Sequence, residues 1–358
     1  MHIRIRNMDL TIILIPILLV ILGMITFYFI NPPNSEILIR QSIFIVLGLS
    51  VMYIGAIFDY RIFRNNSAPT IMFYLFSMVL LLLTFTSQAI RGAQAWTTIF
   101  GIQFEPSELV KLATIIVLAK YFSQKHVEIY NAKHIIISGF YAGLPAIIAL
   151  FQSDFGSTIV FFAIWISVLL FGGINKKHLL GLIIISVVVA SAGWFLALRP
   201  YQQNRLISFL NPYKDPSGAG FHVIQAQTTF GSGKMFGTVF EGREKDVSVS
   251  VPEPYTDFVF SAFGQKFGLV GTMILLSLFA ILLLRIGKIS SKIQNNFAKL
   301  FALGFMAFIF THIVINVGMN LGLMPITGIP LPFVSQGGSH LITLFLGIGI
   351  IQSMRLRT

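Results

Sequence analysis

The chain has 358 residues, of which 55% are hydrophobic and only 11% are charged. Apolar runs recur from Leu10 to Ile351, which excludes a soluble globular domain and is typical of an integral membrane protein. The net charge of +12 is a feature shared with nucleic-acid-binding proteins, but the placement of the basic residues argues against that partner. The absence of cysteine excludes disulfides, thiolate nucleophiles and cysteine-based metal sites.

The apolar runs predict the transmembrane organisation. Counting about 20 apolar residues per crossing, we predict an all-α polytopic membrane protein of about ten helices, forming one domain over residues 1–358. The first run follows MHIRIRNMDL without a small-residue cleavage site, so we interpret it as an uncleaved span. The predicted spans lie near residues 10–30, 41–58, 70–88, 107–122, 134–150, 156–174, 178–198, 257–284, 298–322 and 339–354.

Lysine and arginine are distributed unevenly between the connections. One side carries most of them, including the Arg285–Lys299 segment, whereas the short connections on the other side carry only Arg40 and Arg91. This bias predicts an N-terminus and a C-terminus that are both cytoplasmic. The positive charge is therefore a topology signal and a surface for anionic membrane lipids, with no nucleic acid among the expected partners.

The connection at about 199–256, between the seventh and eighth predicted spans, is much longer than the others and is expected to be a folded extracytoplasmic loop. Its GSGK segment resembles a phosphate loop, but Thr228 and Met235 stand where that motif requires Gly and Ser or Thr, which rejects a nucleotide site. Arg205 and Lys234 remain candidates for binding an anionic headgroup such as a pyrophosphate. The alternative is a solvated loop with incidental charge.

Three charged residues lie at the predicted outer ends of the fourth and sixth spans. Glu108 and Lys111 are three residues apart and share a helix face. Each charge is costly in an apolar helix, so the pair either contributes to ligand binding or forms a structural ion pair. Asp154 is better explained as a helix cap, although it belongs to the same outer layer.

The stretch VPEPYTDFVFSAFGQKFGLVG, residues 251–271, places Asp257 where a polar segment meets an apolar run. An acid at that depth is a candidate site residue. The alternative is that Thr256 or Asp257 caps the following helix.

The last outer connection, MPITGIPLPFVSQGGSHLI, contains three prolines and three glycines between two apolar runs. Irregular backbone at membrane depth is tolerated when it is buried in protein or lines a cavity, so we expect this segment to line one. His312, inside the ninth span, is expected to be a packed and hydrogen-bonded core histidine rather than a ligand. The sequence contains no HExxH or GxSxG motif.

Several blocks together resemble the SEDS family (shape, elongation, division and sporulation proteins, which include RodA and FtsW). They are FEPSELVKLA, QSDFGSTIV, YQQNRLISFLNPYKDPSGAGFHVIQAQ, VPEPYTDFVFSAFG and PITGIPLPFVSQGGS, in this order over nearly the whole chain. The resemblance implies a peptidoglycan glycosyltransferase that polymerises lipid II at the outer face of the bacterial cytoplasmic membrane. It also implies a class B penicillin-binding protein as partner.

The family's essential aspartate falls on Asp257, which we expect to be the general base that deprotonates the acceptor sugar hydroxyl. The departing pyrophosphate needs positive charge, from basic residues or from a divalent cation such as Mg²⁺ or Mn²⁺. The expected substrate-binding residues are Glu108, Lys111, Asp154, Arg205, Lys234, Ser335, Gly337 and Gly338.

Four positions depart from the family pattern: Ala95, Gln265, Lys266 and Gln336. They leave the subfamily open, and the sequence does not distinguish a role in elongation, division or sporulation. Two other function classes also stay open. One is a transporter that flips lipid II, although transporters usually place polar groups near the midplane between repeats. The other is a non-catalytic scaffold for a penicillin-binding protein.

Overall fold

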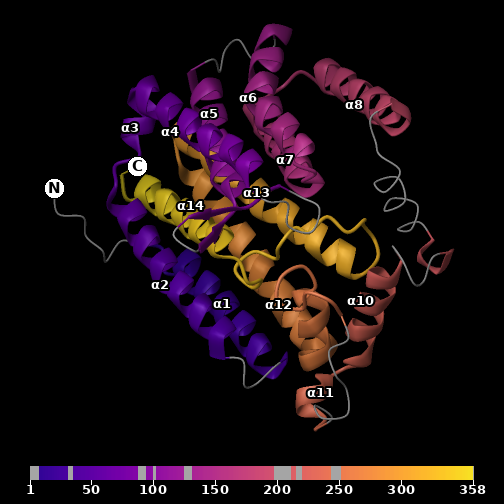
Figure 1. Ribbon diagram of the computed structural model, residues 1–358. Coiled ribbons are helices and arrows are strands. Elements are labelled where there is room, and N and C mark those ends of the chain that lie inside the picture. The colour runs from indigo at the N-terminus through magenta and orange to yellow at the C-terminus, as the bar shows by residue number, and fades with distance from the viewer. Residues whose placement is uncertain are drawn as a thin grey trace.

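In the computed structural model the described part of the chain forms a bundle of helices and a short β-hairpin (Figure 1). The structure describes residues 8–30, 35–87, 94–99, 102–124, 131–196, 211–214, 220–242 and 251–357. The helices are α1 (Thr11–Ile30), α2 (Ser35–Ile57), α3 (Arg61–Asn65), α4 (Ser67–Leu83), α5 (Pro106–Gln124), α6 (Ala132–Phe151), α7 (Phe155–Gly172), α8 (Lys176–Leu196), α10 (Phe221–Ser232), α11 (Gly237–Phe240), α12 (Val259–Lys292), α13 (Asn296–Asn320) and α14 (Gly338–Arg357). Within the described ranges, 3₁₀ helices occupy Thr84–Thr86 and Pro212–Lys214, and the strands are β1 (Thr97–Ile99) and β2 (Ile102–Phe104).

The predicted all-α membrane architecture is confirmed. Among the described residues, eight helices are long and apolar enough to cross a membrane, namely α1, α2, α4, α6, α7, α12, α13 and α14. Helices α5 and α8 have 19 and 21 residues, so each of the ten predicted spans corresponds to a long helix. Helix α5 is more polar than the eight because it carries Glu108, Lys111 and Lys120.

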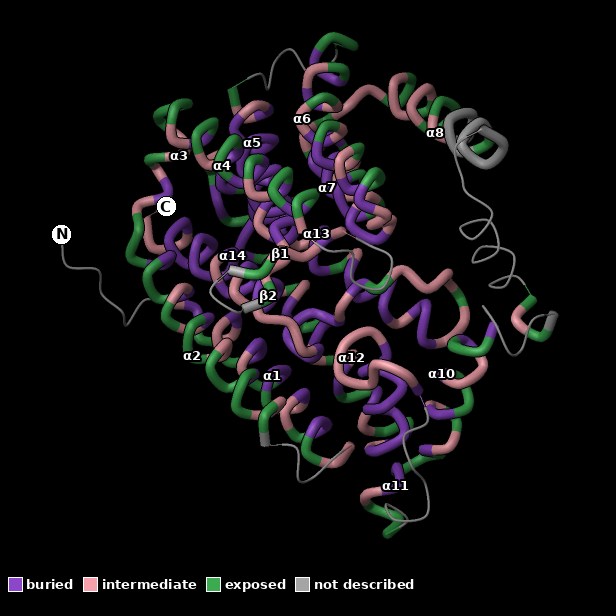
Figure 2. The backbone as a smooth tube through the Cα atoms, in the orientation of Figure 1, coloured by how far each residue is buried: buried purple, intermediate pink, exposed green. Residues whose placement is uncertain are grey.

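The helices differ in how much of their surface is covered by protein. Helices α5, α13 and α14 are mostly buried, whereas α2 and α4 are exposed over much of their length (Figure 2). The exposed residues of α2 and α4 include many large apolar side chains. An apolar surface of that extent suits contact with lipid rather than with water. Most of the polar residues of α5, α13 and α14 are therefore enclosed by neighbouring helices.

The two termini lie at the same end of the bundle. The backbone amide of Asp9 donates to Gln352 Oε1 at 3.0 Å, and Gln352 Nε2 donates to the carbonyl of Asp9 at 2.8 Å. Arg285 of α12 donates to Asp9 Oδ2 at 2.9 Å. At the other end of α1, the ring of Phe27 meets that of Tyr255 edge-on at 5.6 Å. Residues 251–257 are therefore remote from both termini.

Helix α12 is interrupted at Gly268, whose φ of 67° and ψ of −168° are not helical. The amides of Leu269 and Val270 donate instead to the carbonyls of Lys234 and Met235, at 3.0 and 3.1 Å. A side chain at Gly268 would meet the backbone of this neighbouring segment, and its positive φ also favours glycine. The segment between α10 and α11 thus supplies the hydrogen bonds that α12 lacks.

The hairpin determines where α5 begins. Strands β1 and β2 pair antiparallel, with Thr97 opposite Phe104. Glu105 follows β2 directly, and Pro106 occupies the first position of α5, where its missing N–H costs nothing. Because α5 begins just after β2, Glu105 and Glu108 lie at the same end of α5.

Candidate functional site

Asp257 lies at the end of segment 251–257, two residues before the first residue of α12, and is partly exposed. Its backbone carbonyl accepts two hydrogen bonds from α13, from Asn316 Nδ2 and Asn320 Nδ2, each at 3.0 Å. Both asparagines are fully buried. The backbone at Asp257 is therefore held by a second helix while its side chain stays at the edge of the protein.

The two asparagines also support the surroundings of Asp257. Asn316 Nδ2 donates to the carbonyl of Ile329 at 2.8 Å. Asn320 Oδ1 accepts from the amide and the hydroxyl of Ser261, at 3.0 and 2.7 Å. The amide of Ser261, in the first turn of α12, has no carbonyl partner within its own helix, and Asn320 of α13 accepts its hydrogen bond. The N-cap residue Phe258 has no side-chain oxygen that could cap the helix.

Sequence reasoning missed Asn316 and Asn320. The available signal was the presence of two amides four residues apart in an otherwise apolar helix, which places them on one face. Such groups are costly in a membrane unless they find partners.

The segment 325–336 forms the other support of Asp257. Ser335 Oγ donates to the carbonyl of Thr256 at 2.6 Å and accepts from the amide of Leu331 at 2.8 Å. The amide of Gln336 donates to the carbonyl of Tyr255 at 2.8 Å. At Gly328, a Cβ atom would lie 3.8 Å from Asp257 Oδ2. The proline-rich and glycine-rich connection therefore lies directly against the segment that bears the acid.

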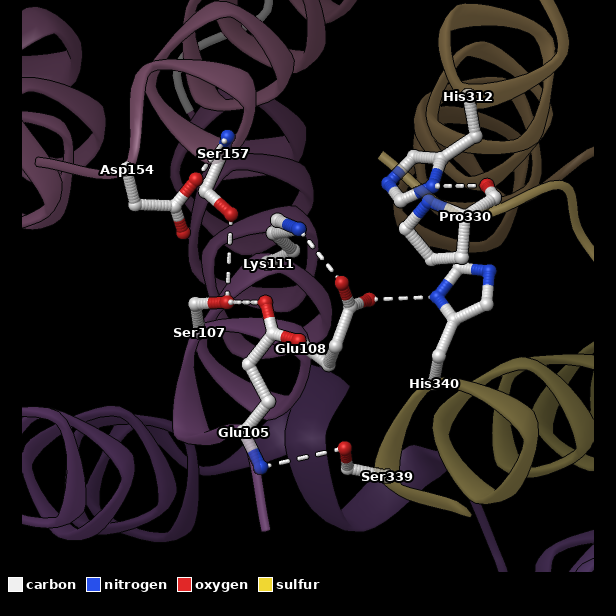
Figure 3. Close-up of polar contacts among 10 residues, drawn as sticks. All are labelled: Glu105, Ser107, Glu108, Lys111, Asp154, Ser157, His312, Pro330, Ser339 and His340. Atoms are coloured by element: carbon white, nitrogen blue, oxygen red, sulfur yellow. Dashed lines mark hydrogen bonds and ion pairs between the residues drawn. The ribbon is translucent and has the colours of Figure 1, made fainter. Parts of the chain in front are cut away.

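A second polar cluster lies in the interior, at the start of α5 (Figure 3). Lys111 Nζ donates to Glu108 Oε1 at 2.7 Å, and Glu108 Oε2 lies 2.8 Å from His340 Nδ1 of α14. Glu108 and Lys111 are both 0% exposed. The Glu108 carboxylate thus binds two partners within the protein. This arrangement favours a structural ion pair over a role of Glu108 and Lys111 in ligand binding.

The remaining acids of this cluster are less well paired. Ser107 Oγ donates to Glu105 Oε1 at 2.8 Å, and burial, followed by repulsion from Glu108, raises the pKa of Glu105 to about 8. Asp154 caps α7 as expected, because its Oδ1 accepts from the amide of Ser157 at 2.9 Å. Its Oδ2 is buried and has no hydrogen-bond partner within the described part of the chain, and burial raises the pKa of Asp154.

His312 is buried and packed, as expected for a residue inside the ninth span. It is 0% exposed, its Nδ1 lies 3.3 Å from the carbonyl of Pro330, and its ring packs against Phe308 and His340 with centroids 4.7 Å apart in both pairs. His340, which stacks on it within 15° of parallel, was not singled out by the sequence. Nothing in its position after the paired glycines indicated that it would meet Glu108.

The other predicted site residues are distributed over several places. Lys234 has an exposed side chain, and its carbonyl accepts from Leu269, twelve residues beyond Asp257 along α12. Gly338 begins α14 and is tightly packed, because a Cβ atom there would lie 2.3 Å from the ring of Phe44. Gly337 is partly exposed beside it. Arg205 lies outside the described residues.

The departures from the family pattern have local explanations. Gln265 Nε2 donates to Ser232 Oγ at 3.0 Å, and the carbonyl of Lys266 lies against Gly237, so both positions join α12 to α10 and α11. Gln336 contacts Tyr255 through its backbone amide, a bond that any non-proline residue would make. Ala95 is buried next to the hairpin.

Taken together, the fold and the site define a polytopic integral membrane protein with a supported, partly exposed aspartate at the end remote from both termini. The chain belongs to the FtsW/RodA/SpoVE family of cell cycle proteins, whose family model matches residues 5–358. The SEDS resemblance is thereby confirmed.

Relatives match over nearly the full length. The chain is 31% identical over 353 residues to the peptidoglycan glycosyltransferase MrdB of Escherichia coli K12, covering 97% of this chain and 93% of that protein. It is 30% identical to the stage V sporulation protein E of Bacillus subtilis, covering 96% of this chain and 95% of the relative.

Solved structures also match over nearly the full length of the chain. One, described as a peptidoglycan synthase complex that coordinates polymerization and crosslinking, contains a chain with a TM-score of 0.83 and 28% identity, covering 97% of both chains. The rod shape determining protein RodA of Thermus thermophilus matches with a TM-score of 0.70 and 26% identity, covering 97% of this chain and 96% of that one.

Proposed function

We propose that this chain is a peptidoglycan glycosyltransferase that polymerises lipid II, with Asp257 as the general base. The observation that carries the proposal is the way Asp257 is held. Two buried asparagines bind its backbone carbonyl, Ser335 binds the preceding carbonyl, and the side chain remains partly exposed. A catalytic carboxylate needs a fixed position and access to its substrate. The names of the full-length relatives support the same activity.

The reaction joins the 4-hydroxyl of an acceptor sugar to the anomeric carbon of a donor. The hydroxyl oxygen forms the new bond, Asp257 takes its proton, and the bond from the anomeric carbon to undecaprenyl pyrophosphate breaks in the same displacement, which inverts that centre. A general base contributes about 10²- to 10⁴-fold to such a step.

The leaving pyrophosphate requires a positive counter-charge. Lys111 is fully buried and paired with Glu108, which favours a structural role for it. We therefore assign the counter-charge to Arg205 or to a divalent cation such as Mg²⁺ or Mn²⁺. Asp257 offers the oxygen ligand that these hard cations prefer, and it would share the cation with the phosphates of the substrate.

The proposed site faces the outside of the bacterial cytoplasmic membrane. Asp9, Arg285, Arg355 and Gln352 gather at the end that holds both termini, and the positive-inside bias assigns that basic end to the cytoplasm. Asp257 lies at the opposite end, where a lipid-linked sugar would meet it.

The proposed partner is a class B penicillin-binding protein, which would crosslink the strands as they form. The solved synthase complex supports this assignment, because the similar chain within it belongs to an assembly that couples polymerization to crosslinking. Lipid-facing helices such as α2 and α4 offer apolar surface for a membrane-spanning segment.

Polymer formation in detergent tests the proposal, because a detergent micelle has no two sides across which lipid II could be flipped. The purified chain, bound to its penicillin-binding protein, is mixed with lipid II, with and without Mg²⁺ or Mn²⁺, and products are separated by size. We expect polymer from the wild type and from Asp59→Asn, a matched change at the opposite end, where Asp59 Oδ2 lies 3.7 Å from Arg357 Nε. We expect none from Asp257→Asn.

The outcomes separate the three function classes. Absence of polymer from the wild-type complex, combined with lipid II translocation in vesicles, would favour the transporter. Full activity of folded Asp257→Asn would refute the assigned base, and cell growth supported by that variant would favour the scaffold.

A further inference from the structure

Three side chains from helices distant in sequence converge in the interior of the bundle. Glu108 of α5, His312 of α13 and His340 of α14 each offer one ligand atom, and these atoms all lie within 4.8 Å of one another. His312 and Glu108 are 0% exposed and His340 is 3% exposed. Figure 3 shows the two rings stacked on the same side of the Glu108 carboxylate. This arrangement brings together three potential metal ligands away from bulk water.

Among the described residues, the Nε2 atom of each imidazole is buried without a hydrogen-bond partner. The Nδ1 atom of His312 faces the carbonyl of Pro330 at 3.3 Å, and that of His340 lies 2.8 Å from Glu108 Oε2. In Figure 3 the Nε2 atom of His312 points toward the side on which Lys111 and Glu108 lie. A histidine that binds metal through one nitrogen commonly donates its other N–H to a carbonyl oxygen. His312 is oriented in that way.

Further carboxyl oxygen atoms lie close to this cluster. The carboxyl groups of Glu105, Glu108 and Asp154 lie near the ammonium group of Lys111, and one oxygen of Asp154 is buried without a hydrogen-bond partner among the described residues. Lys111 binds only Oε1 of Glu108, at 2.7 Å, so Oε2 remains on the side of His340. Lys111 and a metal ion can therefore share this carboxylate, one at each oxygen.

We propose that Glu108, His312 and His340 form a binding site for a divalent transition metal, with Zn²⁺ as the expected ion. Two imidazole nitrogens and one carboxylate oxygen suit Zn²⁺, which binds such ligands at about 2.0–2.2 Å and prefers four ligands. Because the three ligand atoms lie within 4.8 Å of one another, a common centre exists no more than about 2.8 Å from each, so movements of at most about 0.7 Å would complete the site.

The site is separate from the cation proposed for the pyrophosphate. Its ligands are buried side chains of the protein, and two of them are nitrogen atoms, which Mg²⁺ does not favour. His312 reaches the carbonyl of Pro330, next to Ile329, whose carbonyl binds Asn316. A metal ion here would join α5, α13 and α14 behind the segment that supports Asp257. This inference rests on the cluster geometry and not on the proposed activity.

Metal content tests the proposal directly. The full chain is purified with an affinity tag that contains no histidine, exposed to Zn²⁺, passed through a desalting column, and analysed for metal by mass spectrometry. We expect about one zinc per wild-type chain, and the same from His134→Gln, which removes a buried histidine bonded to Tyr121 elsewhere in the bundle. We expect a loss of at least tenfold in the double variant His312→Gln with His340→Gln. Zinc-free wild type, or a double variant that retains its zinc, would overturn the proposal.

Cobalt provides a readout that does not depend on the variants being folded. Co²⁺ added to the wild-type chain is expected to give the visible absorption bands of a four-coordinate ion, to be displaced by Zn²⁺, and to be unaffected by a large excess of Mg²⁺. The spectrum of hydrated Co²⁺ alone would refute the site. A metal-dependent rise in unfolding temperature, present in the wild type and in His134→Gln and absent from the double variant, would confirm its structural effect.

Discussion

The two ends of the bundle balance charge in opposite ways. At the end with both termini, the single carboxylate of Asp9 is surrounded by Arg285, Arg355 and Gln352. Near the start of α5, the carboxyl groups of Glu105, Glu108 and Asp154 lie near Lys111, which bonds to Glu108. At residues 251–257, Asp257 is held by its backbone, and its side chain is partly exposed. At the first end, one carboxylate that binds several basic groups ties helices together. At the second end, carboxyl groups outnumber basic groups, and such carboxyl groups can bind a cation or accept a proton.

Replacement of Asp257 should give the largest functional effect. Asp257→Asn keeps the size of the side chain and the backbone bonds from Asn316 and Asn320, but it removes the proton acceptor. We expect polymerisation to fall by about 10²- to 10⁴-fold, with an unchanged unfolding temperature. A parallel loss of thermal stability would instead indicate that the carboxylate has a structural role.

Glu108 should give the largest effect on stability. Glu108→Gln leaves Lys111 charged and buried beside a neutral group, and breaking a buried pair in this way costs about 3–5 kcal/mol. The double variant Glu108→Gln with Lys111→Met should recover most of this loss in denaturant unfolding. A stable double variant that still fails to bind lipid II would show that the pair contacts substrate.

Asn316 should have an intermediate effect on activity. Asn316→Ala removes the bonds to the carbonyls of Asp257 and Ile329, and misplacement of a catalytic group by about 1 Å can reduce turnover by about 10²-fold. We expect kcat to fall while KM changes little. Asn131→Ala, which removes the exposed cap of α6, is the matched control and should leave turnover unchanged.

Asp9 should give the smallest effect, confined to acid pH. Burial opposes its ionisation, but the hydrogen bond from Arg285 and the charge of Arg355 hold the pKa of Asp9 below its ordinary value of 3.8. Because the native pKa is the lower one, this stabilisation is present above 3.8 and is lost as the pH falls through the native pKa. Unfolding temperature measured against pH should therefore decline less steeply in acid for Asp9→Asn than for the wild type. Equal slopes would contradict the assignment.

Much of the architecture follows from the sequence because apolar runs of membrane length have few alternatives. The predicted runs at 178–198 and 298–322 correspond to Lys176–Leu196 and Asn296–Asn320. Asp154 was also predicted as a cap, since capping depends on local sequence. Asn320 and His340 were not predicted, because their partners Ser261 and Glu108 are 59 and 232 residues away. Such contacts arise only from helix packing.

The interruption at Gly268 divides α12 into a short segment, residues 259–267, and a long segment that follows it. Residues 259–267, which follow Asp257, are separated at Gly268 from the long lipid-facing portion, and the carbonyls of Lys234 and Met235 bind the first amides beyond the break. Gly233 and Gly237 lie directly against the backbone of the shorter part. A protein that displaced α10 or α11 from the outside would thus shift the aspartate without having to tilt the remainder of α12 within the bilayer.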